Sequence, residues 1–90
     1  MADQKLSQVR NEFVARVSKP VISQLLDDLL EDKVLNEEEK DSVKEENNAR
    51  AEQARCLIDM VRKKGPQASK KMIGRVQERD SVLYESLGLE

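Results

Sequence analysis

The segment SKPVISQLLDDLLE, residues 18–31, decides the fold class of this 90-residue chain. Its apolar residues recur at spacings of three and four, which is the period of an α-helix with one broad buried face. Ser18 stands before the run as a helix cap, and Pro20 occupies the first turn, where its missing amide proton costs nothing. The segment therefore predicts a helix that packs one face into a core.

The same period continues upstream and predicts another helix there. Leu6, Val9, Phe13 and Val17 form one apolar stripe at spacings of three and four. In a straight helix Arg10 would project close to this stripe. We therefore expect a bend or break in the first helix that turns Arg10 outward.

Downstream, capping and stop signals divide the chain into four more helices. Asn36 and Glu39 fit a capping box before a third helix. Gly65 ends a fourth helix, and Asp80 or Ser81 caps a short sixth one after the fifth. The sequence predicts an all-α fold, a six-helix antiparallel bundle. The apolar residues assigned to the last two helices are Ala68, Met72, Ile73, Val76, Val82, Leu83 and Leu87.

Length and composition restrict the class of protein. Ninety residues make one domain, residues 1–90, and no apolar run approaches the roughly 18 residues that a membrane span needs. The polar amino terminus is unlike a secretory signal, so we expect a soluble, cytoplasmic protein. With one cysteine, Cys56, and no histidine, neither an internal disulfide nor a Cys/His metal site is expected. Cys56 is interpreted as a packed or half-buried residue.

The charges are sorted along the chain. Residues 23–48 hold ten acidic side chains against three basic ones, whereas residues 49–79 hold nine basic side chains against three acidic ones. In the helix of residues 18–31, Asp27 and Glu31 fall opposite the apolar face, with Asp28 beside them, so all three are expected to point to water or to a partner. A domain with an acidic side and a basic side is suited to a charged partner, including a second copy of itself.

Two charged patches follow from this sorting. Because they differ and are complementary, they predict a heterologous contact between copies, and such a contact propagates as a filament when it does not close into a ring. The alternative is that these faces are only solvated and that Arg55 pairs with Asp59 within one helix. The acidic patch comprises Asp27, Asp28, Glu31, Glu38 and Asp41, and the basic patch comprises Arg10, Arg55, Arg62 and Lys63.

Other function classes find little support in the sequence. It contains no histidine, no Gly-rich phosphate loop and no Gly-x-Ser-x-Gly elbow, so neither catalysis nor a cofactor is expected. Residues 62–71 are basic, but the chain has a net charge of −2, and its two aromatic residues are not placed as a stacking platform. We therefore expect binding to protein, with no nucleic-acid or membrane partner.

An ordered set of short motifs carries a resemblance to a known family. No single motif is diagnostic, but their order and spacing resemble a caspase recruitment domain of the death-fold superfamily. The likeness is greatest to the amino-terminal domain of inflammatory caspases and to their short, inhibitor-like relatives. The motifs are Leu25-Leu26-Asp27, Val34-Leu35, Val43-Lys44, Glu46-Asn47, Leu57-Ile58-Asp59, Lys64-Gly65, Asp80-Ser81 and Leu87-Gly88-Leu89.

The resemblance implies a Greek-key bundle of six helices with a kinked or broken first helix. It also implies homotypic association, in which helices 1 and 4 of one copy dock against helices 2 and 3 of another. Two further contacts are implied, one between the surroundings of Lys63 and Glu78, and one between the helix 3 surface near Asn36 and the corner of helices 1 and 2.

Three roles are compatible with such a domain. In the first, it recruits an inflammatory caspase to the adaptor or sensor filaments of an inflammasome. In the second, it is a stand-alone decoy that caps such filaments. In the third, it belongs to an adaptor or a sensor. Length alone does not separate these roles, nor does it say whether a protease domain follows.

Overall fold

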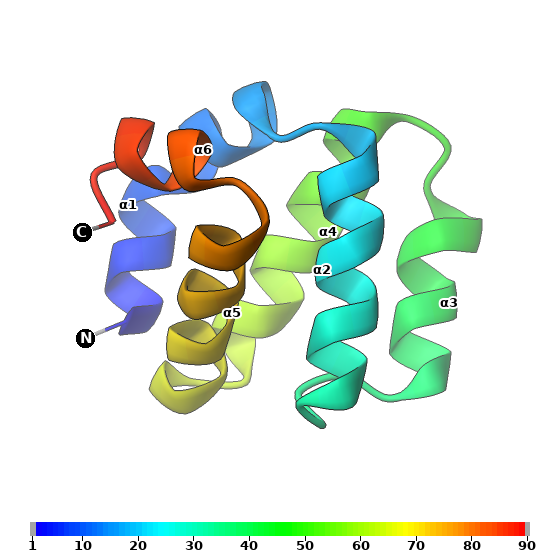
Figure 1. Ribbon diagram of the computed structural model, residues 1–90. Helices are drawn as coiled ribbons and strands as arrows, with labels where there is room; N and C mark the ends of the chain where they lie inside the picture. Colours follow the sequence, from blue (N-terminus) through cyan, green and yellow to red (C-terminus); the bar gives the residue numbers. More distant parts are fainter. Residues whose placement is uncertain (1, 90) are drawn as a thin grey trace.

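The computed structural model describes residues 2–89 and contains six α-helices within them (Figure 1). Met1 and Glu90, the two ends of the expected domain, lie outside the described residues. None of the described helices is both long and apolar enough to cross a bilayer. The helices are α1 (Ala2–Arg16), α2 (Lys19–Glu31), α3 (Glu37–Glu46), α4 (Arg50–Lys63), α5 (Pro66–Arg79) and α6 (Ser81–Ser86).

One core joins all six helices. Helix α1 packs against α4 and α5, α2 packs against α5, and α6 covers another part of α5, so partners distant in sequence lie side by side (Figure 1). This order gives the bundle its Greek-key connectivity. Phe13, Leu25, Leu57 and Met72 are among the side chains with almost no exposed surface. Full burial of one such side chain stabilises the fold by roughly 1.5–3 kcal/mol.

The predicted caps form as the sequence indicates. The Ser18 hydroxyl accepts a hydrogen bond from the Val21 backbone N–H at 3.3 Å. The Asn36 side chain accepts from the Glu39 N–H at 2.8 Å, and the Glu39 carboxylate accepts from the Asn36 N–H at 3.0 Å. These bonds satisfy amide groups that have no partner inside the helix, and they fix where α2 and α3 begin.

Of the two expected possibilities for α1, a bend or a break, the structure shows the bend. The ribbon changes direction along its length (Figure 1), while the helix runs without interruption through Ala2–Arg16. Arg10, however, does not turn away from the fold. Its guanidinium reaches Asp59 on α4, with N–O distances of 2.7 and 2.9 Å, so an ion pair relieves the conflict that the sequence pattern showed.

Two of the three apolar residues assigned to the sixth helix are buried. Leu83 and Leu87 enter the core, whereas the Val82 side chain is 74% exposed. A helix of six residues turns only one narrow face toward its neighbour, and the spacing of four between Leu83 and Leu87 defines that face. Cys56 is half-buried, as expected.

Two ion pairs fasten the end of α2 to α5. Arg79 holds the Asp28 carboxylate through two hydrogen bonds of 2.7 Å, and Arg75 holds Asp32 through bonds of 2.7 and 2.9 Å. The Asp28 side chain is only 4% exposed. Its expected place in the exposed acidic patch is therefore wrong, because packing against α5 covers it.

Hydrogen bonding to Arg79 holds the pKa of Asp28 below its usual value, although burial acts in the opposite direction. Hydrogen bonding to Arg75 likewise lowers the pKa of Asp32. Because the folded state keeps both carboxylates charged, their stabilisation is complete above their unfolded pKa of about 4 and is lost as the pH falls further.

Asp28→Asn should therefore destabilise the domain at pH 7, by about 1.5–3 kcal/mol, because the substitution weakens a hydrogen-bonded charge pair with a buried carboxylate. The loss should shrink as the pH is lowered below about 4, since the Asp28 carboxyl of the unfolded wild-type chain then binds a proton that the folded state resists, and the stabilisation disappears. Urea denaturation at several pH values measures both effects.

Asp41→Asn is the matched control, because Asp41 is exposed and forms no ion pair among residues 2–89. It should change the free energy of unfolding by less than about 0.5 kcal/mol. Equal effects of the two substitutions at pH 7 would contradict the assignment of Asp28 as a structural residue.

Candidate protein-binding surfaces

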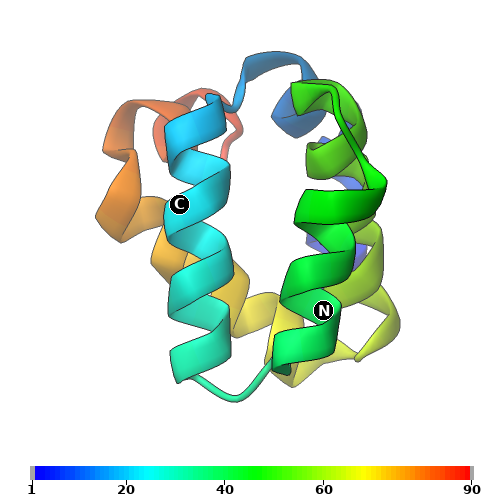
Figure 2. The same ribbon diagram turned by 90° about the vertical axis from the view of Figure 1, so that its right-hand side faces the viewer.

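The first candidate surface lies on α2 and α3, which run side by side (Figure 2). Asp27 and Glu31 come from the exposed side of α2, and Glu38 and Asp41 come from the exposed side of α3. We call these four residues the acidic surface. It contains every residue of the predicted acidic patch except the buried Asp28.

A lysine that the sequence analysis left out stands within the acidic surface. The Lys40 ammonium lies 2.7 Å from an Asp27 carboxylate oxygen. The Asp27 side chain is 60% exposed, whereas that of Lys40 is only 20% exposed. This pairing lowers the pKa of Asp27 and raises that of Lys40. Asp27 therefore faces solvent with one of its oxygens already occupied.

The second candidate surface lies on α1 and α4 and holds the four predicted cations, which we call the basic surface. Asp59 sits between two of them: Arg10 contacts it at 2.7 Å and Arg62 contacts it at 3.3 Å. Hydrogen bonding to Arg10 is the main reason that the pKa of Asp59 is lowered. Asp59 thus neutralises part of this surface from within.

Arg55 and Lys63 are the cations of the basic surface that remain available. Both are exposed, and within the described part of the chain neither forms an ion pair. The alternative pairing of Arg55 with Asp59 within α4 is therefore wrong, because Asp59 turns to Arg10 and Arg62 instead. Arg55 keeps its full set of guanidinium donors for a partner.

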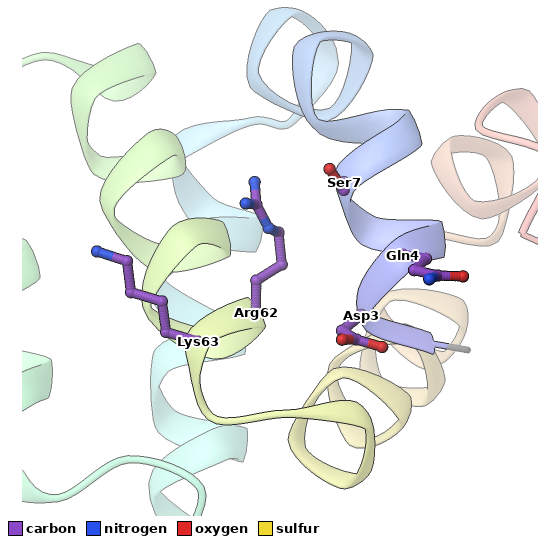
Figure 3. Close-up of a pocket in the computed structure, with 5 residues that line it drawn as sticks. All are labelled: Asp3, Gln4, Ser7, Arg62 and Lys63. Atoms are coloured by element: carbon purple, nitrogen blue, oxygen red, sulfur yellow. The ribbon is translucent and has the colours of Figure 1, made fainter.

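A shallow groove of about 320 Å³ runs between α1 and α4 beside the basic surface (Figure 3). Asp3, Gln4 and Ser7 line it from α1, and Arg62 and Lys63 line it from α4. One Asp3 carboxylate oxygen is covered and has no hydrogen-bond partner among the described residues. The groove presents polar groups of both signs, which suits contact with a protein surface better than it suits an apolar ligand.

Several charged side chains bind groups on other helices inside the molecule, and the sequence did not predict these contacts. Lys64, the residue directly after α4, contacts Glu39 on α3 at 2.8 Å, in addition to the two pairs that join α2 to α5. Arg50 donates to the carbonyl oxygens of Val14 and Val17 at 2.6 and 2.8 Å and so caps the end of α1. Such partners lie dozens of residues apart, and the sequence contains no local signal for them.

The two surfaces do not neutralise each other. Among residues 2–89, every ion pair of Asp27 stays within α2 and α3, and every ion pair of Arg10 and Arg62 stays within α1 and α4. Glu31 joins no ion pair in this part of the chain. One molecule thus offers anions on one pair of helices and cations on another. These features define a helical protein-interaction domain of the death-fold class.

Residues 3–90 match the family model of the caspase recruitment domain, so the chain belongs to the caspase recruitment domain family. The solution structure of ICEBERG, an inhibitor of interleukin-1beta generation, has a TM-score of 0.86 and 39% sequence identity to this chain. That match covers 94% of this chain and 96% of ICEBERG.

Relatives of two different lengths match this chain. Caspase-1 of the horse, Equus caballus, is 45% identical over 89 residues, which are 99% of this chain and 22% of the caspase. Human caspase recruitment domain-containing protein 18 is 42% identical over 89 residues, and the match covers 99% of both chains. The chain therefore spans about a fifth of the length of caspase-1 and nearly all of the shorter relative.

Membership in this family confirms the resemblance stated from the sequence motifs, including the death fold. A caspase recruitment domain is an interaction module and not a catalytic domain, so this chain is not itself an enzyme.

The structure predicts different roles for two arginines of the basic surface. Arg10→Gln should lower the midpoint of thermal unfolding, because it removes a cation that joins α1 to α4 through Asp59. Arg55→Gln should leave the midpoint unchanged, since Arg55 is exposed and forms no ion pair in the described residues. Circular dichroism at 222 nm during heating measures both midpoints, and an equal loss for the two variants would contradict this division.

Proposed function

We propose that this domain associates with other caspase recruitment domains by placing its acidic surface against the basic surface of a neighbour. One observation carries the proposal. Arg55 is exposed on α4 and forms no ion pair among residues 2–89, while the acids Glu31, Glu38 and Asp41 are exposed on α2 and α3. A surface that keeps its charges unpaired is ready to exchange water for a partner of opposite sign.

The contact is heterologous, so each bound copy keeps its other surface free for the next copy, and assembly continues along a helix of subunits when the contact does not close into a ring. Each exposed charge pair contributes only about 0–1 kcal/mol, and salt screens it. Filaments therefore need several contacts for each subunit. The family resemblance supplies two more: the surroundings of Lys63 with those of Glu78, and the α3 surface near Asn36 with the α1–α2 corner.

The role that we propose is recruitment of an inflammatory caspase, in the cytoplasm, to adaptor or sensor filaments of an inflammasome. Similarity to about a fifth of caspase-1 supports it. In that role the domain brings protease domains together by joining a filament. The partners are other caspase recruitment domains, and no nucleic acid or membrane takes part.

A second candidate function is that of a decoy that caps the same filaments. The similarity to ICEBERG, an inhibitor of interleukin-1beta generation, favours it. The same surfaces serve both roles. What differs is whether a bound copy allows the next subunit to add.

Growth of preformed filaments separates the two roles. Labelled seeds of a caspase recruitment domain, such as that of caspase-1, are mixed with this chain, and fluorescence microscopy follows their length. A recruiting domain should extend the seeds along their axis. A decoy should stop the growth of the filaments at a molar ratio of this chain to the filament subunit well below one.

The purified domain should form filaments or high-order oligomers at low salt, with a threshold concentration that rises as salt is added. Asp27→Arg and Arg55→Glu should each keep the domain folded and monomeric, because each places like charges across the proposed contact. An equimolar mixture of the two variants should associate, since one retains an intact acidic surface and the other an intact basic surface. Light scattering and electron microscopy report the assemblies.

Glu85→Lys, on the exposed side of α6, is the matched control for Asp27→Arg, because it changes the net charge by the same amount away from both surfaces. It should assemble like the parent. If Asp27→Arg and Arg55→Glu also assemble like the parent, the proposed contact is wrong.

A further inference from the structure

Lys40 stands at the centre of the acidic surface. It lies on α3, 2.7 Å from Asp27 on α2, and it also attracts the carboxylates of Glu37 and Asp41 on its own helix. Only 20% of its side chain is exposed, so its stem is packed between the two helices. A lysine held in this way is a fixed positive charge within a surface that is otherwise negative.

A cationic residue of a partner that approaches Asp27 finds one carboxylate oxygen already paired with this charge. It must either displace the Lys40 ammonium or share the carboxylate with it, and two cations on one carboxylate repel each other. Displacement is hindered because the packed stem leaves the ammonium little room to move away. Lys40 therefore opposes the contact that the acidic surface otherwise favours.

We infer that Lys40 is an internal counterion that limits how tightly Asp27 holds a cation of a partner domain. This inference rests on the proposed function, since it concerns the same contact between acidic and basic surfaces. Lys40 thereby sets the affinity of the acidic surface, and it favours partners that reach Glu31 and Glu38 as well as Asp27.

Lys44 provides the matched comparison on the same helix. It is exposed, lies one turn beyond Lys40, and attracts Asp27 without forming an ion pair within the described residues. Replacement of either lysine by glutamine changes the net charge equally. Only the replacement of Lys40 frees an oxygen of Asp27.

The test uses two variants that are each unable to polymerise, so that a single contact is measured. Arg55→Glu supplies the intact acidic surface, and Asp27→Arg supplies the intact basic surface. Lys40→Gln is added to the Arg55→Glu chain, and isothermal titration calorimetry at low salt measures its binding to the Asp27→Arg chain. We expect Lys40→Gln to tighten binding by about two- to fivefold, which is the range of an exposed ion pair.

Two further variants in the Arg55→Glu chain define the cause. Lys44→Gln should tighten binding clearly less than Lys40→Gln, and Lys40→Arg should leave it unchanged because the charge and the pairing remain. Lys40→Met keeps the aliphatic stem and should reproduce Lys40→Gln, which excludes an effect of lost packing. Thermal unfolding of each chain confirms that it is folded at the temperature of the titration.

Each outcome decides the inference. If Lys44→Gln tightens binding as much as Lys40→Gln does, the effect comes from net charge. If binding is unchanged or weaker with both Lys40→Gln and Lys40→Met, Lys40 does not oppose the contact. Either result overturns the inference and leaves the proposed function standing. If the Arg55→Glu and Asp27→Arg chains do not bind at all, the proposed contact fails and the inference fails with it.

Discussion

The buried carboxylate of Asp28 fixes the orientation of α2, and much of the surface chemistry depends on that orientation. Arg79, on α5, donates a hydrogen bond to each carboxylate oxygen of Asp28. Arg75, also on α5, binds Asp32, which lies four residues after Asp28. Because neighbouring residues on a helix project about 100° apart, turning Asp28 into the bundle directs Asp27 away from it. An ion pair inside the fold thus helps to determine which of the two acids faces solvent.

Basic residues are likewise divided between contacts inside the fold and the exposed surface. Arg50 caps α1, and Lys64 pairs with Glu39 at the start of α3. Arg75 and Arg79 form the two ion pairs that join the end of α2 to α5. These cations stabilise the bundle and are not free for a partner. The cations free for a partner are therefore fewer than the nine basic side chains of residues 49–79, and Arg55 is the most exposed guanidinium of the basic surface. This explains how a chain of strongly sorted charge can keep a defined pair of contact surfaces.

Local sequence patterns predicted the helices and their caps because the responsible contacts span three or four residues. Ser18, the Asn36–Glu39 capping box and Asp80 all act on amide groups within one turn. The predicted surfaces were less accurate, since the fate of a charged side chain depends on helices far away in the sequence. Asp28 and Arg79 are 51 residues apart, and Arg10 and Asp59 are 49 apart. No local pattern separates such pairs from solvated charges.

Each surface also carries one charge of the opposite sign, Lys40 among the acids and Asp59 among the bases. These charges reduce the binding free energy of a single contact. In the proposed filament each subunit contacts several neighbours, and the combined contacts bind it more tightly than one contact could. In the proposed assembly, weak single contacts with strong collective binding would keep the domain monomeric below a threshold concentration and assembled above it. Recruitment and capping, the two proposed roles, would use the same surfaces, so the charges on those surfaces would set the threshold for both.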